Sequence, residues 1–200
     1  MTPAAEAATR GQQHGYYRLA AVAPRVRVAD VAGNTRELIA AAHEAAEQGA
    51  HVILFPELAL TGYSCGDLFF QATLQAAALR GLRELAEGTA GISALVVTTI
   101  PLLVQEGLYN VAAVLKEGRL LGLAPKSVLP NYREFYERRQ FRPAADLRVE
   151  SVCVPGWGET PIGTDLLFCD GEGLTLGVEV SPDLVEVIDR PETKVEAANG

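Results

Sequence analysis

Short apolar runs alternate with longer amphipathic stretches along most of the chain, and this alternation predicts a mixed α/β fold. Apolar runs of strand length, bounded by turn-forming residues, predict β-strands. The expected strands cover residues 18–23, 51–55, 94–100, 110–115, 119–123, 165–169 and 174–180. Two longer stretches, residues 34–48 and 67–87, predict helices.

The helix expected over residues 34–48 carries signals at both ends. Asn34 followed by Glu37 resembles a capping box at its start, and Gly49 is expected to end it. An apolar stripe beginning at Leu38 predicts that one face packs on a core.

Two pairs of expected strands are joined by short segments that contain glycine. Residues 116–118 separate one pair and residues 170–173 separate the other, which predicts two β-hairpins. Hairpins mixed with strand-helix units predict a sheet that carries its helices on one face.

Three apolar runs end on a side chain suited to chemistry. Glu57, Lys126 and Ser181 each follow such a run, directly or after a single proline. Strand ends are a usual place for active sites in α/β folds. A carboxylate, an ammonium group and a hydroxyl suggest a base, a cation and a nucleophile. Taken singly, each residue also fits an ordinary turn or surface position. Only their combined context, order and spacing favours a shared site.

The residues around these three positions form longer motifs. Phe55-Pro56-Glu57-Leu58 is followed by Leu60-Thr61-Gly62-Tyr63, Lys126 lies within residues 124–137, and Leu176-Gly177-Val178-Glu179-Val180 is followed by Asp183-Leu184. They resemble the glutamate, lysine and nucleophile motifs of the nitrilase, or carbon-nitrogen hydrolase, superfamily. The long lysine segment resembles the N-terminal glutaminase domain of the glutamine-dependent NAD+ synthetase branch.

The resemblance implies a chemistry for each residue. In the family a thiolate attacks the side-chain amide of glutamine, ammonia leaves, and water hydrolyses the thioester. Glu57 would be the general base and Lys126 would stabilise the tetrahedral intermediate. Tyr132 would help to hold glutamine. The resemblance also implies a nitrilase-like αββα sandwich, a half-sandwich per chain that pairs with a second copy, and therefore a homo-oligomer.

The nucleophile motif departs from the family pattern. Ser181 and Pro182 stand where the family has cysteine and glutamate, and residues 185–200 do not resemble the family's sequence beyond this motif. An alkanol is a much weaker acid than a thiol, so we predict little or no glutaminase activity. The expected layout is a mobile leader over residues 1–15, a partial carbon-nitrogen hydrolase domain over 16–184, incomplete at its C-terminus, and an atypical tail over 185–200.

Composition narrows the classes of partner and compartment. The chain has 200 residues, 48% of them hydrophobic, and a net charge of −8. This charge argues against binding to nucleic acid or an anionic membrane. Three cysteines at wide spacing, without a CxxC pair, fit a reducing cytoplasmic compartment better than a disulfide framework. The histidines lack companions at ligand spacing, so no metal site is expected.

Neither a GxGxxG fingerprint nor a Walker-type loop occurs in the sequence. ATP and Mg²⁺ would therefore belong to a synthetase domain that is not part of this chain, and no cofactor is expected for the domain itself. Three hypotheses stay open: the glutaminase part of a glutamine-dependent NAD+ synthetase, a stand-alone nitrilase-type amidase, and a non-catalytic pseudoenzyme that assembles with an active partner.

Overall fold

Five strands form the main sheet, in the spatial order β1-β2-β3-β4-β5. They are β1 (Leu19–Ala21), β2 (Val52–Leu54), β3 (Leu95–Val104), β4 (Gly107–Lys116) and β5 (Arg119–Pro125). The computed structural model describes residues 15–171, 173–180 and 195–196. The first three strands run parallel to one another, whereas β4 and β5 are antiparallel to their neighbours and continue the sheet as a meander. The α/β class expected from the sequence is confirmed.

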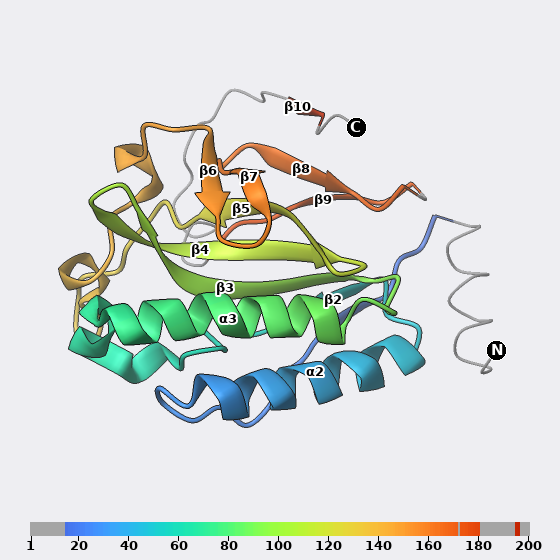
Figure 1. Ribbon diagram of the computed structural model, residues 1–200. Coiled ribbons are helices and arrows are strands. Elements are labelled where there is room, and N and C mark those ends of the chain that lie inside the picture. The colour runs from blue at the N-terminus through green and yellow to red at the C-terminus, as the bar shows by residue number, and fades with distance from the viewer. Residues whose placement is uncertain (1–14, 172, 181–194, 197–200) are drawn as a thin grey trace.

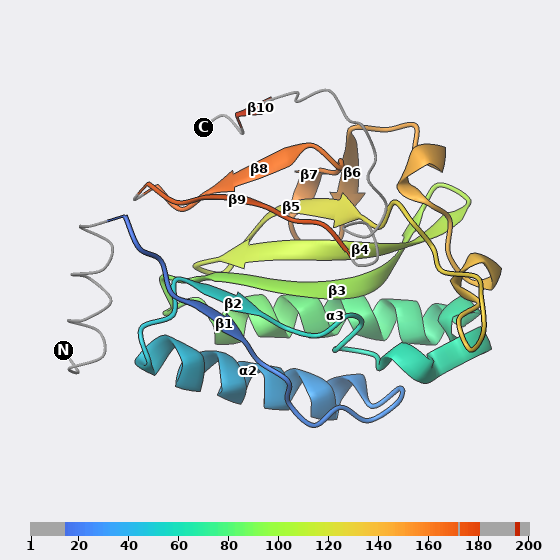
Figure 2. The ribbon, with the colours of Figure 1, turned by 180° about the vertical axis from the view of Figure 1, so that it is seen from behind.

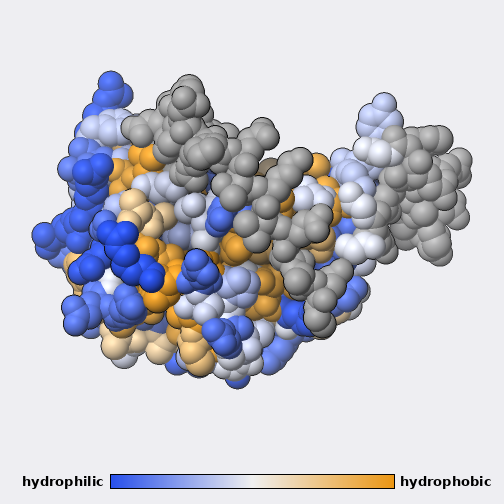
Figure 3. Space-filling model, turned by 90° about the horizontal axis from the view of Figure 1, so that it is seen from above, coloured by the Kyte–Doolittle hydropathy of each residue, from blue (hydrophilic) through white to orange (hydrophobic). Residues whose placement is uncertain are grey.

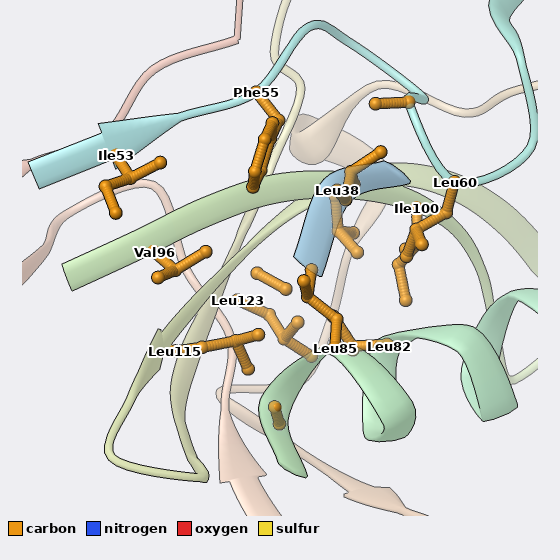
Figure 4. Close-up of a cluster of buried hydrophobic side chains, with 14 of the residues drawn as sticks. Leu38, Ile53, Phe55, Leu60, Leu82, Leu85, Val96, Ile100, Leu115 and Leu123 are labelled. Carbon is orange, nitrogen blue, oxygen red and sulfur yellow. The ribbon is translucent and has the colours of Figure 1, made fainter. Parts of the chain in front are cut away.

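Two helices cover one face of this sheet (Figure 1). They are α2 (Val31–Glu47) and α3 (Ala72–Gly88), which pack against each other. Their buried leucines meet apolar side chains of the sheet in the main core, drawn in Figure 4. None of the helices in the described ranges is long and apolar enough to cross a membrane.

The start of α2 differs from the capping box expected at Asn34. Asp30 is the N-cap, and its Oδ1 accepts a hydrogen bond from the Gly33 amide at 3.0 Å. Asn34 lies inside the first turn, where its buried side-chain amide donates to the main-chain oxygens of Arg27 and Leu60 at 2.7 and 3.0 Å. The predicted start was wrong because a second capping residue lies four positions upstream. Gly49, with a φ of 79°, follows the end of the helix as predicted.

The long helix expected over residues 67–87 is two elements. A 3₁₀ segment, η1 (Tyr63–Phe70), comes first, and α3 begins only after Gln71, whose φ of −75° and ψ of 119° are extended. The break lets Phe69 turn inward, where it is 2% exposed and packs against Phe141 with ring centroids 5.0 Å apart. This tertiary contact outweighs the local helical pattern.

A second sheet lies against the opposite face of the main sheet (Figures 1 and 2). It contains the predicted hairpin of β8 (Leu166–Cys169) and β9 (Thr175–Gly177), with β10 (Val195–Glu196) paired to β8 in parallel. The strand expected over 174–180 ends at Gly177. A hollow of about 550 Å³ lies between the β1–β2 edge and this hairpin. On that side the space-filling view shows hydrophobic residues exposed between hydrophilic ones (Figure 3).

The segment between the two sheets holds elements that the apolar pattern did not predict. A short hairpin is formed by β6 (Ser151–Val154) and β7 (Gly158–Pro161). Two single turns of 3₁₀ helix, η2 (Glu137–Arg139) and η3 (Ala144–Asp146), precede it. These elements are short and mostly exposed, so their sequences lack a strong apolar period.

Candidate active site

Glu57 lies in a tight turn that follows β2 at the edge of the main sheet. The Phe55 amide still donates to the Val97 oxygen of β3 at 2.9 Å, after which the chain leaves the sheet. Leu58 has a φ of 55°, in the left-handed region, and its amide donates to the Thr99 hydroxyl. The main chain on both sides of Glu57 is therefore held by β3.

Lys126 follows β5 directly and points into the protein, where it is 1% exposed. Its amide donates to the main-chain oxygen of Asn110 in β4 at 2.9 Å, and its own oxygen accepts from Ala144 at 2.9 Å. The Nζ atom lies 2.6 Å from Glu57 Oε1. The structure thus brings together two of the side chains that the sequence analysis selected.

A second carboxylate completes the surroundings of Lys126. Glu137 opens η2, is 5% exposed, and its Oε1 and Oε2 lie 3.0 and 2.9 Å from Lys126 Nζ. The Tyr63 hydroxyl donates to Glu137 Oε1 at 2.6 Å. Glu137 was not predicted as a site residue from the sequence, although it lies inside the lysine motif. The sequence does hold one signal. Glu137 directly follows Tyr136 and precedes Phe141 by four residues, and aromatic neighbours are unusual for a solvent-exposed acid.

One ammonium group between two carboxylates leaves this cluster with an excess of negative charge. Burial raises the pKa of the Glu57 carboxyl above its ordinary value, and the nearby charge of Glu137 raises it further. The hydrogen bonds from Lys126 and Asn110 act in the opposite direction but do not cancel the effect of burial. A carboxyl group with a raised pKa that stays in contact with a buried ammonium is suited to take up and return a proton.

Tyr63 contributes through its hydroxyl group rather than through its charge. Burial, followed by the hydrogen bond to Glu137, raises the pKa of this phenol, so it stays a neutral donor. Its ring packs edge-on against Phe135, with centroids 6.4 Å apart. A cavity of about 230 Å³, lined by Tyr63, Phe135 and Glu137 among others, lies beside the cluster. Its aromatic walls and acidic end suit a small polar molecule.

An exposed salt bridge joins η1 and η2, two segments that each contribute residues to the lining of this cavity. Arg139 of η2 donates from Nε and Nη2 to the two carboxylate oxygens of Asp67 in η1, at 2.8 and 2.7 Å. Both side chains are exposed, and Arg139 lowers the pKa of Asp67. Because both side chains are exposed, this bridge contributes little to stability.

Of the other two residues selected from the sequence, the structure describes only Tyr132. Tyr132 is 59% exposed, and its ring contacts Phe135 with centroids 5.7 Å apart. Its role in binding glutamine stays a prediction. Ser181 lies outside the described residues, next to Val180, which is 5% exposed. Within the described ranges, no three His, Cys, Asp or Glu residues group as metal ligands would.

Comparison with known proteins relates this geometry to a family. The carbon-nitrogen hydrolase family model matches residues 18–197. A glutamine-dependent NAD+ synthetase from Mycobacterium tuberculosis is 38% identical over 174 residues, which cover 86% of this chain and 25% of that protein. A synthetase of the same name from Thermotoga maritima is 31% identical and is matched over 76% of this chain and 28% of its own length. The chain spans about a quarter of the length of these relatives.

Solved structures agree with the sequence matches. A glutamine-dependent NAD+ synthetase from Cytophaga hutchinsonii superposes with a TM-score of 0.68 and 25% identity over 76% of this chain and 26% of that one. An amidase from Nesterenkonia sp. superposes with a TM-score of 0.55 and 25% identity over 71% of this chain and 52% of that one. With most of its length matched by the family model, the chain belongs to the carbon-nitrogen hydrolase family.

Proposed function

We propose that this chain is the glutaminase part of a glutamine-dependent NAD+ synthetase, and that Ser181 leaves it with little or no turnover. The observation that carries the proposal is the buried Lys126, which lies 2.6 Å from one carboxylate and 2.9 Å from another at the end of β5. A stable sheet does not need a buried lysine, since desolvation of an ammonium is costly. The names of the relatives support glutamine as the substrate.

The proposed reaction assigns one step to each member of the cluster. Glu57 takes the proton of the nucleophile. The nucleophile's oxygen (Ser181) or sulfur (a cysteine at the same position) attacks the amide carbon of glutamine. Lys126 stabilises the negative charge that develops on the carbonyl oxygen. Glu57 then passes the proton to the amide nitrogen, the C–N bond breaks and ammonia leaves. Water, activated by Glu57, hydrolyses the acyl-enzyme to glutamate.

Ser181 should be a poor nucleophile in this reaction. A free thiol has a pKa of about 8.5 and is partly ionised near neutral pH, whereas an alkanol needs much stronger activation. In one solved structure of a mutant Nesterenkonia amidase, an acetamide moiety is covalently added at the active-site cysteine. A serine at the equivalent motif position should therefore form the acyl-enzyme very slowly.

The test is to compare the chain with its Ser181→Cys variant, measuring ammonia released from glutamine. We expect ammonia release only from the variant, and we expect a second change, Glu57→Gln, to abolish it. Short aliphatic amides serve as alternative substrates. If the cysteine variant hydrolyses these amides but not glutamine, the chain is a nitrilase-type amidase of another branch. If it hydrolyses neither, the catalytic proposal fails.

A pseudoenzyme is the second candidate, and Ser181 is the observation that favours it. In that case the unaltered chain would assemble with an intact synthetase without releasing ammonia itself. Sedimentation of the chain mixed with a full-length glutamine-dependent NAD+ synthetase would detect the assembly. The synthetase would supply the ATP and Mg²⁺ chemistry that makes NAD+. Independent sedimentation of the two proteins would remove this candidate.

A further inference from the structure

Asn110 connects the two charged residues that the proposed reaction uses. It lies within β4 and is completely buried. Its side-chain Nδ2 donates to Glu57 Oε1 at 2.5 Å. Its main-chain oxygen accepts from the Lys126 amide at 2.9 Å. β4 therefore holds the end of β5 through a main-chain hydrogen bond to Lys126. It holds the Glu57 carboxylate, which follows β2, through a side-chain hydrogen bond.

The partners of Glu57 determine which way the Asn110 amide points. Glu57 Oε1 accepts a hydrogen bond from Lys126 Nζ at 2.6 Å, so this oxygen is an acceptor. If the amide were reversed, its oxygen would lie against Oε1, and two acceptors would repel each other. The donating Nδ2 atom must therefore face Glu57.

This orientation carries a cost in folding free energy. Asn110 Oδ1 is buried and has no hydrogen-bond partner in the part of the chain that the structure describes. A buried acceptor without a partner destabilises the folded state, and an apolar side chain of similar volume would avoid that cost. Packing of β4 therefore does not account for an amide at this position, whereas the contact with Glu57 does.

We propose that Asn110 is a positioning residue that directs the proton taken up by Glu57 to its Oε2 atom. This inference rests on the proposed function, in which Glu57 is the base. Oε1 is occupied by two donors, Lys126 Nζ and Asn110 Nδ2. The proton that leaves the nucleophile therefore binds Oε2, and from there it moves to the amide nitrogen as the C–N bond breaks. The carboxylate regains its original charge.

The groups that face Glu57 come from three other elements. Lys126 follows β5, Glu137 opens η2, and Tyr63 of η1 reaches the cluster through Glu137. Asn110 is uncharged and donates directly to Glu57, so replacing it removes a donor without changing the charge around Glu57. The hydrogen bond from Asn110 favours the ionised carboxyl, and its loss should raise the pKa of Glu57 further.

The first experiment follows the Glu57 carboxyl by ¹³C NMR as pH is varied, with its signal assigned from the Glu57→Gln variant. Asn110→Leu keeps the branched shape of the side chain and removes the donor, and Asn110→Ala removes the donor without adding methyl groups. Thr98→Val is the matched control, because Thr98 is also buried in the sheet with an unpaired hydroxyl among the described residues. We expect the pKa of Glu57 to rise in both Asn110 variants and to stay unchanged in Thr98→Val. An unchanged pKa in folded Asn110 variants would overturn the proposal.

The second experiment separates this inference from the proposed function. In the Ser181→Cys background, we expect Asn110→Leu to lower kcat/KM for glutamine about 10- to 100-fold and to move the acidic limb of its pH profile to higher pH. Thr98→Val should do neither. If Ser181→Cys releases no ammonia while the pKa of Glu57 still rises in Asn110→Leu, the function fails and the positioning role stands. If Ser181→Cys is active and Asn110→Leu behaves like Thr98→Val, the positioning role fails and the function stands.

Discussion

Replacing Lys126 by methionine is the sharpest test of the charge cluster. Methionine keeps the length of the side chain and removes the ammonium that lies 2.6 Å from Glu57 and 2.9 Å from Glu137. Two carboxylates then share a mostly buried site without a cation. Breaking a buried ion pair from one side typically costs about 3–5 kcal/mol, because the charge left behind keeps its desolvation penalty. We expect a loss of this size in the free energy of unfolding at pH 7.

The stability lost in Lys126→Met should increase as pH rises. Glu57 already has a raised pKa, so the stability gained from its protonation is present at low pH and is lost as pH rises through that pKa. Without Lys126, which lowers the pKa of Glu57, that pKa rises further. The variant should therefore be close to the unaltered chain at acidic pH and should fall below it progressively toward neutral pH.

The assay is urea unfolding followed by circular dichroism at several pH values between acidic and neutral. Lys116→Met is the matched control, since Lys116 ends β4 and donates only to a main-chain oxygen, that of Asp170, among its described hydrogen bonds. Removing one such hydrogen bond should cost about 1 kcal/mol. If Lys126→Met loses no more stability than Lys116→Met, or loses the same amount at every pH, the reasoning about a buried charge cluster is refuted.

Three further predictions concern the cluster, a helix cap and the core. In Glu137→Gln the pKa of Glu57 should fall, because a neighbouring negative charge that raises it is gone, and ¹³C NMR titration of the carboxyl checks this. Asp30→Ala should lower the free energy of unfolding in urea by about 0.5–2 kcal/mol, because the N-cap of α2 is lost. Glu37→Ala should leave it nearly unchanged. A larger loss in Glu37→Ala than in Asp30→Ala would support the capping box at Asn34 instead. Leu85→Ala should cost about 2–5 kcal/mol because Leu85 is fully buried in the main core, and a smaller loss would mean that the core closes around the cavity.

Local patterns predicted those elements whose apolar residues are periodic. The expected strands over 94–100, 110–115 and 119–123 correspond to β3, β4 and β5, and the hairpin after Cys169 is also present. The break at Gln71 was not predictable in the same way. The residues after Gln71 favour a helix, and the contact between Phe69 and Phe141 that accompanies the break forms only in the tertiary structure.

The sequence by itself determined that Glu57 and Lys126 each follow a strand, because apolar runs and prolines are local signals that need no knowledge of the fold. Only the tertiary structure decided that Glu137 and Asn110 join them. Glu137 belongs to a segment without apolar period, whose path depends on contacts with η1. Asn110 lies within a strand, and nothing in its sequence reveals that its side chain meets the turn after β2, since that contact forms only when β2, β3 and β4 are aligned in one sheet.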